Sequence, residues 1–184
     1  MAASTSQGTG PGSAYNIKPL VFNGDVKAGN LSPMAVQDNL AGERKILVVS
    51  KSTVTLTEAD HAGKMIVLDR AAGVTVTLPA SSGNGAKYTI LVKTTVTSNS
   101  DIVKVANTSD SFVGRAIATK DEGTTSNNIW PVASGDDTIT LNGSTTGGYA
   151  GDTIELIDIG GNKFVVNAFL KQTASEATPF SATV

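Results

Sequence analysis

The sequence contains one histidine, His61, which directly follows Asp60 in the segment TEADHAG. Histidine next to a carboxylate is a pairing used in acid–base catalysis, but adjacent residues of a chain project in different directions. No serine lies in the Gly-x-Ser-x-Gly pattern of a nucleophile elbow. Cysteine is absent, which excludes thiolate catalysis and cysteine-type zinc or iron–sulfur sites. We therefore interpret His61 as a solvated residue of a short turn.

Acidic residues gather in the second half of the chain, at Asp136, Asp137, Asp152, Glu155 and Asp158. Paired carboxylates carry out glycoside hydrolysis. Side chains alternate along a strand, so in DTIELID the two aspartates share one face and Glu155 lies on the other. The chain also has a single tryptophan and few aromatic residues for a sugar platform. We interpret these carboxylates as strand-end and solvent-face charges, and we predict no catalytic residue and no enzyme.

Glycine-rich loops could hold a cation or a phosphate. GDD and GGYAGD supply oxygen ligands, but they lack the alternating acidic spacing of a calcium loop. No glycine-rich segment follows a strand and opens a helix, as a nucleotide-binding loop does. We interpret the loops at 83–85 and 143–151 as turns. No cofactor, metal or small-molecule substrate is predicted.

The charge balance disfavours two classes of partner. The 184 residues include 14 basic and 16 acidic ones, giving a formal charge of −2, and the basic residues are spread singly along the chain. The basic residues therefore form no continuous stripe that could bind nucleic acid. The longest apolar run is 46–49, far too short for a transmembrane helix. We therefore expect neither nucleic acid nor a membrane as partner.

Short strands separated by turn residues must position these groups. Only 16% of the residues are charged and 5% aromatic, which is typical of a β-rich structural chain. Gly160-Gly161 between two apolar runs predicts a hairpin, and one helical turn is predicted at 57–63, with Thr57 as N-cap and Gly63 as C-cap. The pattern predicts an all-β fold, an antiparallel β-sandwich or barrel, of which a jelly roll is one form. The predicted strands are 45–56, 64–68, 74–78, 87–93, 101–106, 112–119, 128–132, 138–141, 153–158 and 163–170.

The motif TVTL occurs at 53–56 and 75–78, and TITL follows at 138–141. The copies begin 22 and 63 residues apart, so they lack the constant period of a solenoid. Threonine and aliphatic residues alternate within each copy, which places the hydroxyl groups on one face. We predict half-buried strands and no stacked threonine array.

The first 42 residues differ from the rest. Residues 1–13 are mostly small and polar, and the apolar residues of 14–42 are interrupted by proline and glycine and follow neither helical nor strand periodicity. We predict an extended N-terminal arm at 1–42, a β domain at 43–172 and a C-terminal tail at 173–184, with Phe180 as a possible anchor. The partner of the arm could be the protein's own body, a sister subunit or another protein. Its predicted contact residues are Tyr15, Ile17, Leu20, Val21 and Phe22.

Three blocks of the sequence resemble β-rich virion structural proteins of tailed bacteriophages. They are TLTEADHAGKMIVLDRAAGVTVTLP, GDTIELIDIGGNKFVVNAFL and the terminal ATPFSA. The resemblance covers roughly 51–182, and similar blocks occur in head decoration (cement) proteins and in tail-fibre domains. Phe164 stands where many of these relatives carry tryptophan. The resemblance implies a structural protein and no catalytic residue.

The arm favours head decoration over the tail. The resemblance and the arm together lead us to expect a capsid decoration protein on the outer surface of the virion head, which stabilises the head by bridging capsid subunits. Its partners would be the major capsid protein and sister subunits, and a homotrimer is expected. The alternative is a tail-fibre or appendage β-domain that attaches to the host. For that role we would expect aromatic-rich loops or coiled-coil heptads, and the sequence has neither.

Overall fold

The computed structural model describes residues 46–120 and 127–184. Within them 47% of the residues are in strands and 3% in helix, which confirms a mostly β chain. The helical turn α2 (Glu58–His61) joins β2 to β3. The strands are β1 (Ile46–Val49), β2 (Thr53–Thr55), β3 (Met65–Leu68), β4 (Thr75–Thr77), β5 (Lys87–Val92), β6 (Asp101–Lys104), β7 (Ser111–Thr119), β8 (Asn127–Pro131), β9 (Thr138–Leu141), β10 (Thr153–Gly160), β11 (Lys163–Lys171) and β12 (Phe180–Ser181).

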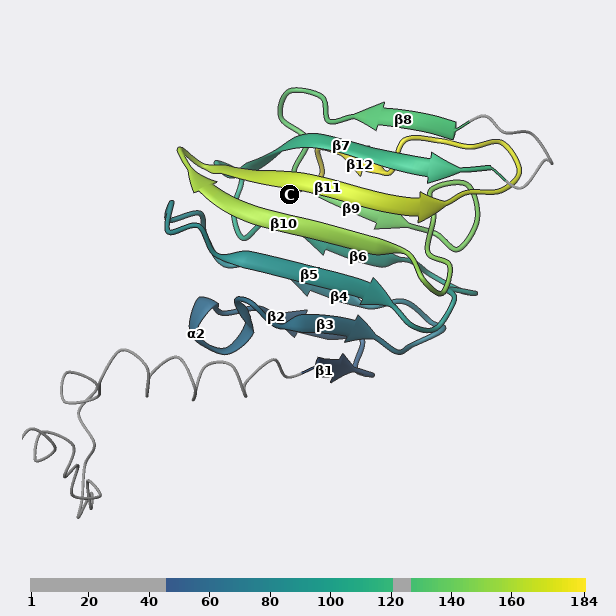
Figure 1. Cartoon of the computed structure of the whole chain (residues 1–184), viewed down its shortest axis with the longest axis horizontal. Helices are drawn as coiled ribbons and strands as arrows, with labels where there is room; N and C mark the ends of the chain where they lie inside the picture. Colours follow the sequence, from purple (N-terminus) through teal and green to yellow (C-terminus); the bar gives the residue numbers. More distant parts are fainter. Residues whose placement is uncertain (1–45, 121–126) are drawn as a thin grey trace, which may run out of the picture. The chain divides into compact units, whose positions relative to one another are not determined.

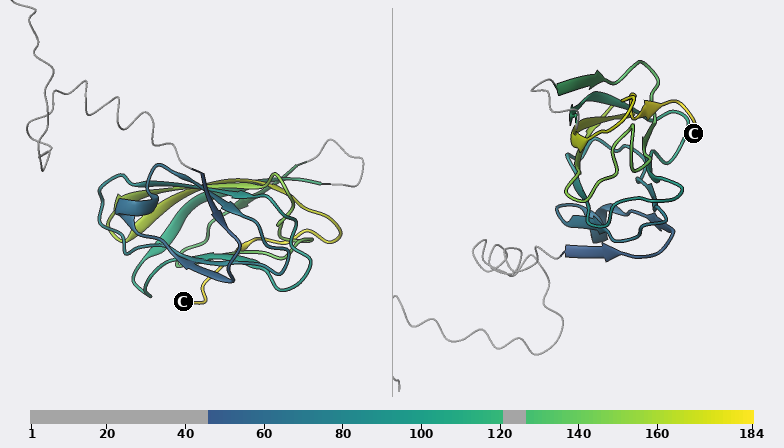
Figure 2. Two further views of the ribbon diagram at one scale, coloured as in Figure 1. Left: turned by 90° about the horizontal axis from the view of Figure 1, so that it is seen from below. Right: turned by 90° about the vertical axis from the view of Figure 1, so that its right-hand side faces the viewer.

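These strands form two sheets. The larger has seven strands in the order β1-β3-β5-β10-β11-β7-β8, and the smaller has five in the order β12-β9-β6-β4-β2 (Figure 1). The two sheets lie as separate layers, seen edge-on in Figure 2. Each layer therefore has one face toward the other sheet and one face away from it.

The prediction of an antiparallel fold is wrong for half of the fold, because both sheets are mixed. From β1 to β6 the chain alternates between the sheets, so each strand lies beside the strand two before it and runs in the same direction. The predicted single strand 45–56 is in fact β1 and β2, which belong to different sheets. From β7 onward most pairs are antiparallel, as in β7 with β8 and β10 with β11, while β7 and β11 pair in parallel.

The first two TVTL copies are neighbours, contrary to prediction. They form β2 and β4, with Thr53 opposite Thr75 and Thr55 opposite Thr77. The 22-residue spacing is one circuit through both sheets, and two strands need no constant period to stack. The third copy, β9, pairs antiparallel with β6. The predicted alternation is confirmed, since Val76 is buried between two partly exposed threonines.

Side chains from both sheets share one hydrophobic core. Alternate residues of each strand point inward, as in β5, where Tyr88, Ile90 and Val92 are buried. Burying an aliphatic side chain of this size contributes about 1.5–3 kcal/mol. Fully buried members from the larger sheet are Ile66, Ile90, Ile154, Leu156 and Phe164, and those from the smaller sheet are Val76, Val103, Ile139 and Leu141.

Three local predictions can be compared directly with the structure. The β10–β11 hairpin is confirmed, but Gly160 pairs with Lys163, so the two loop residues are Gly161 and Asn162. Both have φ of 61°, as a type I′ turn requires. The helical turn begins at Thr57 as predicted, while its C-cap is Ala62 and not Gly63. Phe180 is buried in the core, and β12 pairs with β9.

Candidate functional site

His61 takes part in the cap of its own helical turn. The Thr57 N–H donates to His61 Nδ1 at 2.9 Å, so this ring nitrogen is an acceptor. The Thr57 hydroxyl donates to Asp60 Oδ2 at 2.8 Å and accepts from the Asp60 N–H at 3.3 Å. Asp60 and His61 thus both hydrogen-bond to Thr57, and these contacts cap the N-terminus of the helical turn.

Asp158 holds two loops together. Its carboxylate accepts from the N–H groups of Ser82 (2.7 Å), Gly83 (3.0 Å) and Gly160 (3.0 Å), and from the hydroxyl groups of Ser81 and Ser82. Burial raises the pKa of Asp158, but these donors outweigh burial and bring the pKa to about 2. The carboxylate therefore stays ionised and its oxygens are fully occupied by loop 81–83 and the hairpin.

Asp152 serves a second loop in the same way. It accepts from the N–H groups of Gly148 (2.7 Å), Tyr149 (3.1 Å) and Lys171 (2.8 Å). Burial raises the pKa of Asp152, and these hydrogen bonds offset only part of that shift. The glycine-rich segment before β10 is thus tied to the end of β11.

Asp137 holds the C-terminal residues. The N–H groups of Thr183 (2.8 Å) and Val184 (3.2 Å) donate to Oδ1, as does the Thr138 hydroxyl (2.8 Å). Burial raises the pKa of Asp137, but the hydrogen bonds outweigh it and the net shift is downward. Three of the five carboxylates considered for catalysis, Asp137, Asp152 and Asp158, therefore hold loops or the chain end in place.

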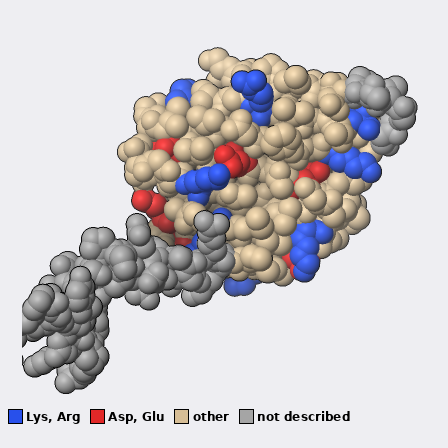
Figure 3. Space-filling view, in the orientation of Figure 1, with Lys and Arg blue, Asp and Glu red and all other residues tan. Residues whose placement is uncertain are grey.

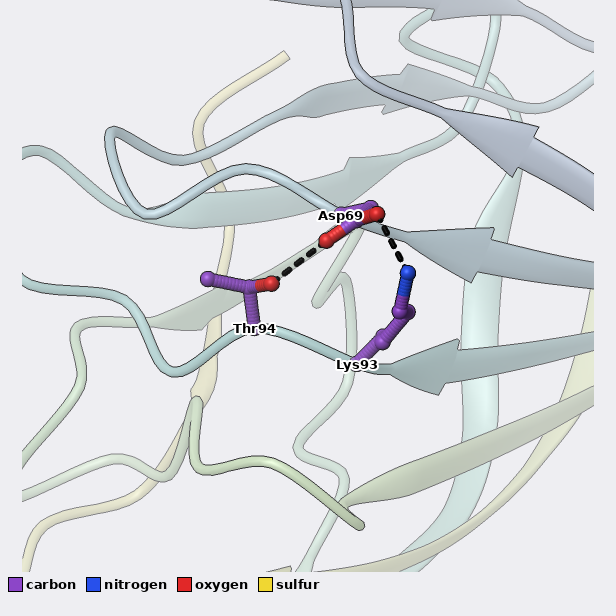
Figure 4. A network of polar contacts seen from close by, with 3 residues as sticks. All are labelled: Asp69, Lys93 and Thr94. Carbon is purple, nitrogen blue, oxygen red and sulfur yellow. Dashed lines mark hydrogen bonds and ion pairs between the residues drawn. The ribbon is translucent and has the colours of Figure 1, made fainter.

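Two partly exposed carboxylates, Glu155 and Asp69, have cationic partners. Glu155 forms an ion pair with Lys87 on the neighbouring strand, on the opposite sheet face from Asp152 and Asp158, as predicted from alternation. Asp69 pairs with Lys93 Nζ at 2.6 Å and accepts from the Thr94 hydroxyl at 2.5 Å (Figure 4). The hydrogen bond from Lys93, followed by that from Thr94, lowers the pKa of Asp69. These contacts clamp the end of β3 to the end of β5.

Asp101 is a buried carboxyl that the sequence analysis did not single out. It is 0% exposed at the start of β6, and its Oδ1 accepts from the Val74 N–H at 2.8 Å. Its Oδ2 has no hydrogen-bond partner. Burial raises the pKa of Asp101 to about 6, against the opposing effect of the Val74 hydrogen bond. In sequence it looks like an ordinary strand-end aspartate after a polar turn, so no signal marks it.

In residues 46–120 and 127–184, no three or more His, Asp and Glu side chains are placed to hold a metal ion together. Within those same ranges, no helix has the length and apolar character needed to span a bilayer.

The outer face of the seven-stranded sheet, the face turned away from the core, carries an apolar row. Residues directly opposite one another on neighbouring strands line up across all seven strands. None of them belongs to the core cluster. We call this set the outer row; in strand order it consists of Val48, Val67, Leu91, Thr153, Phe169, Ile117 and Ile129.

Several members of the outer row are strongly exposed. Phe169 is 62% exposed, Ile129 63% and Val48 51%. A shallow groove beside Phe169 is lined also by Thr89, Thr153, Glu155 and Asn167. Figure 3 views the sheet from outside and shows scattered charged side chains among a majority of uncharged ones. This face is the candidate interaction surface.

The sequence analysis missed the outer row. Its signal was available in KFVVNAFLK, where Val165 and Phe169 are apolar at positions that alternate with the buried ones. A strand with one solvated face would carry polar residues there. The predicted arm residues Tyr15, Ile17, Leu20, Val21 and Phe22 lie outside the described residues.

Comparisons of this chain with protein-family models, with curated proteins and with solved structures find no match.

Proposed function

We propose that this protein is a non-enzymatic structural component of a tailed-bacteriophage virion, a decoration protein that binds the outer surface of the head. It stabilises the shell by bridging capsid subunits, with the major capsid protein and sister copies as partners. The body would be a β-sandwich made of the two sheets, carrying an N-terminal arm at 1–42. Two observations support this proposal. The sequence blocks resemble those of phage virion proteins, and buried carboxylates hold loops of the structure in place.

The observation that carries this proposal is that three of the buried carboxylates are occupied by hydrogen bonds from the chain itself, whereas Oδ2 of Asp101 has no partner. Asp137, Asp152 and Asp158 accept backbone N–H groups from loops and from the chain end. A catalytic acid or base needs an oxygen free to meet a substrate. Here the oxygens of these three carboxylates are bonded to loops and to the chain end, which suits a protein that must keep its shape on a particle.

The stabilisation of the head would be the sum of small contributions from many copies of the protein. Apolar surface buried by each arm contributes about 25 cal/mol per Å2, less the cost of ordering the arm. A repeated lattice multiplies a modest contribution per copy. Strong individual binding is therefore not required.

Deletion of residues 1–42 tests the arm. We expect the truncated protein to keep the β spectrum and thermal transition of the full chain, because the described body begins at β1. Its binding to heads assembled without this protein should fall at least tenfold, measured by co-sedimentation. A second variant keeps the full-length chain but has serine in place of five arm residues, and its binding should fall as much as that of the deletion. The five residues are Tyr15, Ile17, Leu20, Val21 and Phe22. Undiminished binding by both proteins would show that the arm is not the bridge.

A further inference from the structure

The outer row lines up apolar side chains across the seven strands; Val48, Phe169 and Ile129 in it are strongly exposed, whereas Val67 is buried at 4% exposure. Single exposed hydrophobic residues are common on soluble proteins, whereas contiguous patches mark contact sites. Six of the seven residues of the outer row are apolar, and each lies directly opposite the next. With strands about 4.8 Å apart, the row extends about 29 Å across the sheet. Exposure is greatest near its two ends and at Phe169.

The adjoining row extends the patch at its edge. It consists of Ile46, Met65, Thr89, Glu155, Asn167, Arg115 and Pro131. Ile46 is 64% exposed and Met65 39% exposed, so apolar surface continues over β1 and β3. The two rows lie two residues apart along the strands, so they form a band about 29 Å long and about 7 Å wide before their side chains are counted. A standard interface takes about 800 Å2 from each partner, a patch roughly 28 Å across, which the length of this band matches.

The charge on this face fits a partner of the same kind. Glu155 is already paired with Lys87. The adjoining row otherwise carries only Arg115, and the outer row carries no charge at all. Beside the outer row the same face also carries Lys171 and the ion pair of Lys93 with Asp69. These basic residues are separated along the face, so two copies of it can meet without large like-charge repulsion.

We propose that this face is the surface by which copies of the chain associate, with the outer row of one copy packed against that of the next. Sheets bury apolar faces by packing on other sheets about 10 Å away, as the inner faces of this protein already do. A second copy supplies a flat apolar face of matching size and low charge. The inference adds the residues of contact between sister copies, and it stands whether or not those copies bind a phage head.

The test measures the mass of the free full-length protein by sedimentation equilibrium over a wide concentration range. The wild type should form an oligomer. The double substitution of Phe169→Ser and Ile129→Ser should weaken association by roughly 30-fold or more, because large apolar side chains dominate interface energies. Both residues are more than 60% exposed in the single chain, so the variant should fold and keep the wild-type β spectrum.

Ile159→Ser is the matched control. Ile159 is 53% exposed but lies at the tip of the β10–β11 hairpin, outside the outer row. We expect the control variant to associate like the wild type. A wild type that remains monomeric, or an oligomer that the double variant leaves intact, overturns the proposal.

Cross-linking gives an independent readout. The chain has no cysteine, so Thr153→Cys places a single thiol at the centre of the outer row. A short bismaleimide should join two copies of this variant efficiently. Thr55→Cys, on the exposed side of the five-stranded sheet, should give little product. Equal yields from the two variants would contradict the proposed surface.

Discussion

Asp158 and Asp101 are both buried aspartates, and their hydrogen bonds give them opposite responses to pH. Asp158 accepts several N–H and O–H donors, and its pKa lies at about 2, below the ordinary value near 3.9. Asp101 accepts one N–H and has an unpartnered oxygen, and its pKa rises to about 6. Ionisation therefore stabilises the fold at Asp158 and destabilises it at Asp101.

Replacing Asp101 by asparagine should change how stability depends on pH. Between pH 4 and 6 the unfolded chain has already lost the Asp101 proton while the folded chain keeps it, so the wild-type free energy of unfolding falls as pH rises. Asp101→Asn removes this loss. From pH 4 to pH 7 the stability of the variant should improve relative to the wild type by roughly 2–3 kcal/mol. Urea unfolding at a series of pH values measures it, and a difference that is constant with pH would refute the assignment.

Asp158→Asn is the companion variant, with the opposite sign. A folded pKa of about 2 means that Asp158 stabilises the protein above pH 4 and that this contribution is lost as pH falls through 2. The variant should be less stable than the wild type at pH 7, by roughly 2 kcal/mol for the weakened charged hydrogen bonds. The gap should narrow in acid. A gap that widens below pH 4 is the outcome that this description does not allow.

At the scale of elements, sequence patterns predicted most strands but not their partners. Alternation located β5, β10 and β11 well, because inward and outward positions differ in polarity. It could not show that Ser50 to Ser52 carries the chain from one sheet to the other, since a bend inside a strand and a change of sheet use the same small polar residues. Because the chain changes sheet after each of the first strands, those strands pair in parallel, and the sequence pattern did not predict this pairing.

Gly114 interrupts β7 with a φ of 126°, and its position depends on the absence of a side chain. A Cβ there would lie 2.1 Å from the Val166 carbonyl oxygen of β11. Gly114→Ala should therefore separate the parallel β7–β11 pair and lower the free energy of unfolding by more than roughly 3 kcal/mol. Chemical denaturation measures the loss.

Gly135→Ala separates the two causes of that loss. Gly135 also has a positive φ, 91°, but nothing lies within 4 Å of an added Cβ. Only backbone strain remains, and we expect a cost of roughly 1–2 kcal/mol. Equal losses at the two positions would mean that the close approach of β7 to β11 is unimportant.

For the molecule as a whole, the two faces of the larger sheet have different tasks. The inner face forms the core with the five-stranded sheet, and the outer face keeps Val48, Phe169 and Ile129 of the outer row exposed. The sequence indicated the inner face through its periodicity. The outer row escaped notice because its residues lie on seven strands that are far apart in sequence and become neighbours only through the sheet order.

The number of copies of this protein on each virion tests the proposed function most directly. Quantitative mass spectrometry of purified particles, referenced to the major capsid protein, provides it. Decoration of the head lattice predicts on the order of hundreds of copies per particle. A count of about three to eighteen would match the symmetry of a tail appendage and would contradict head decoration.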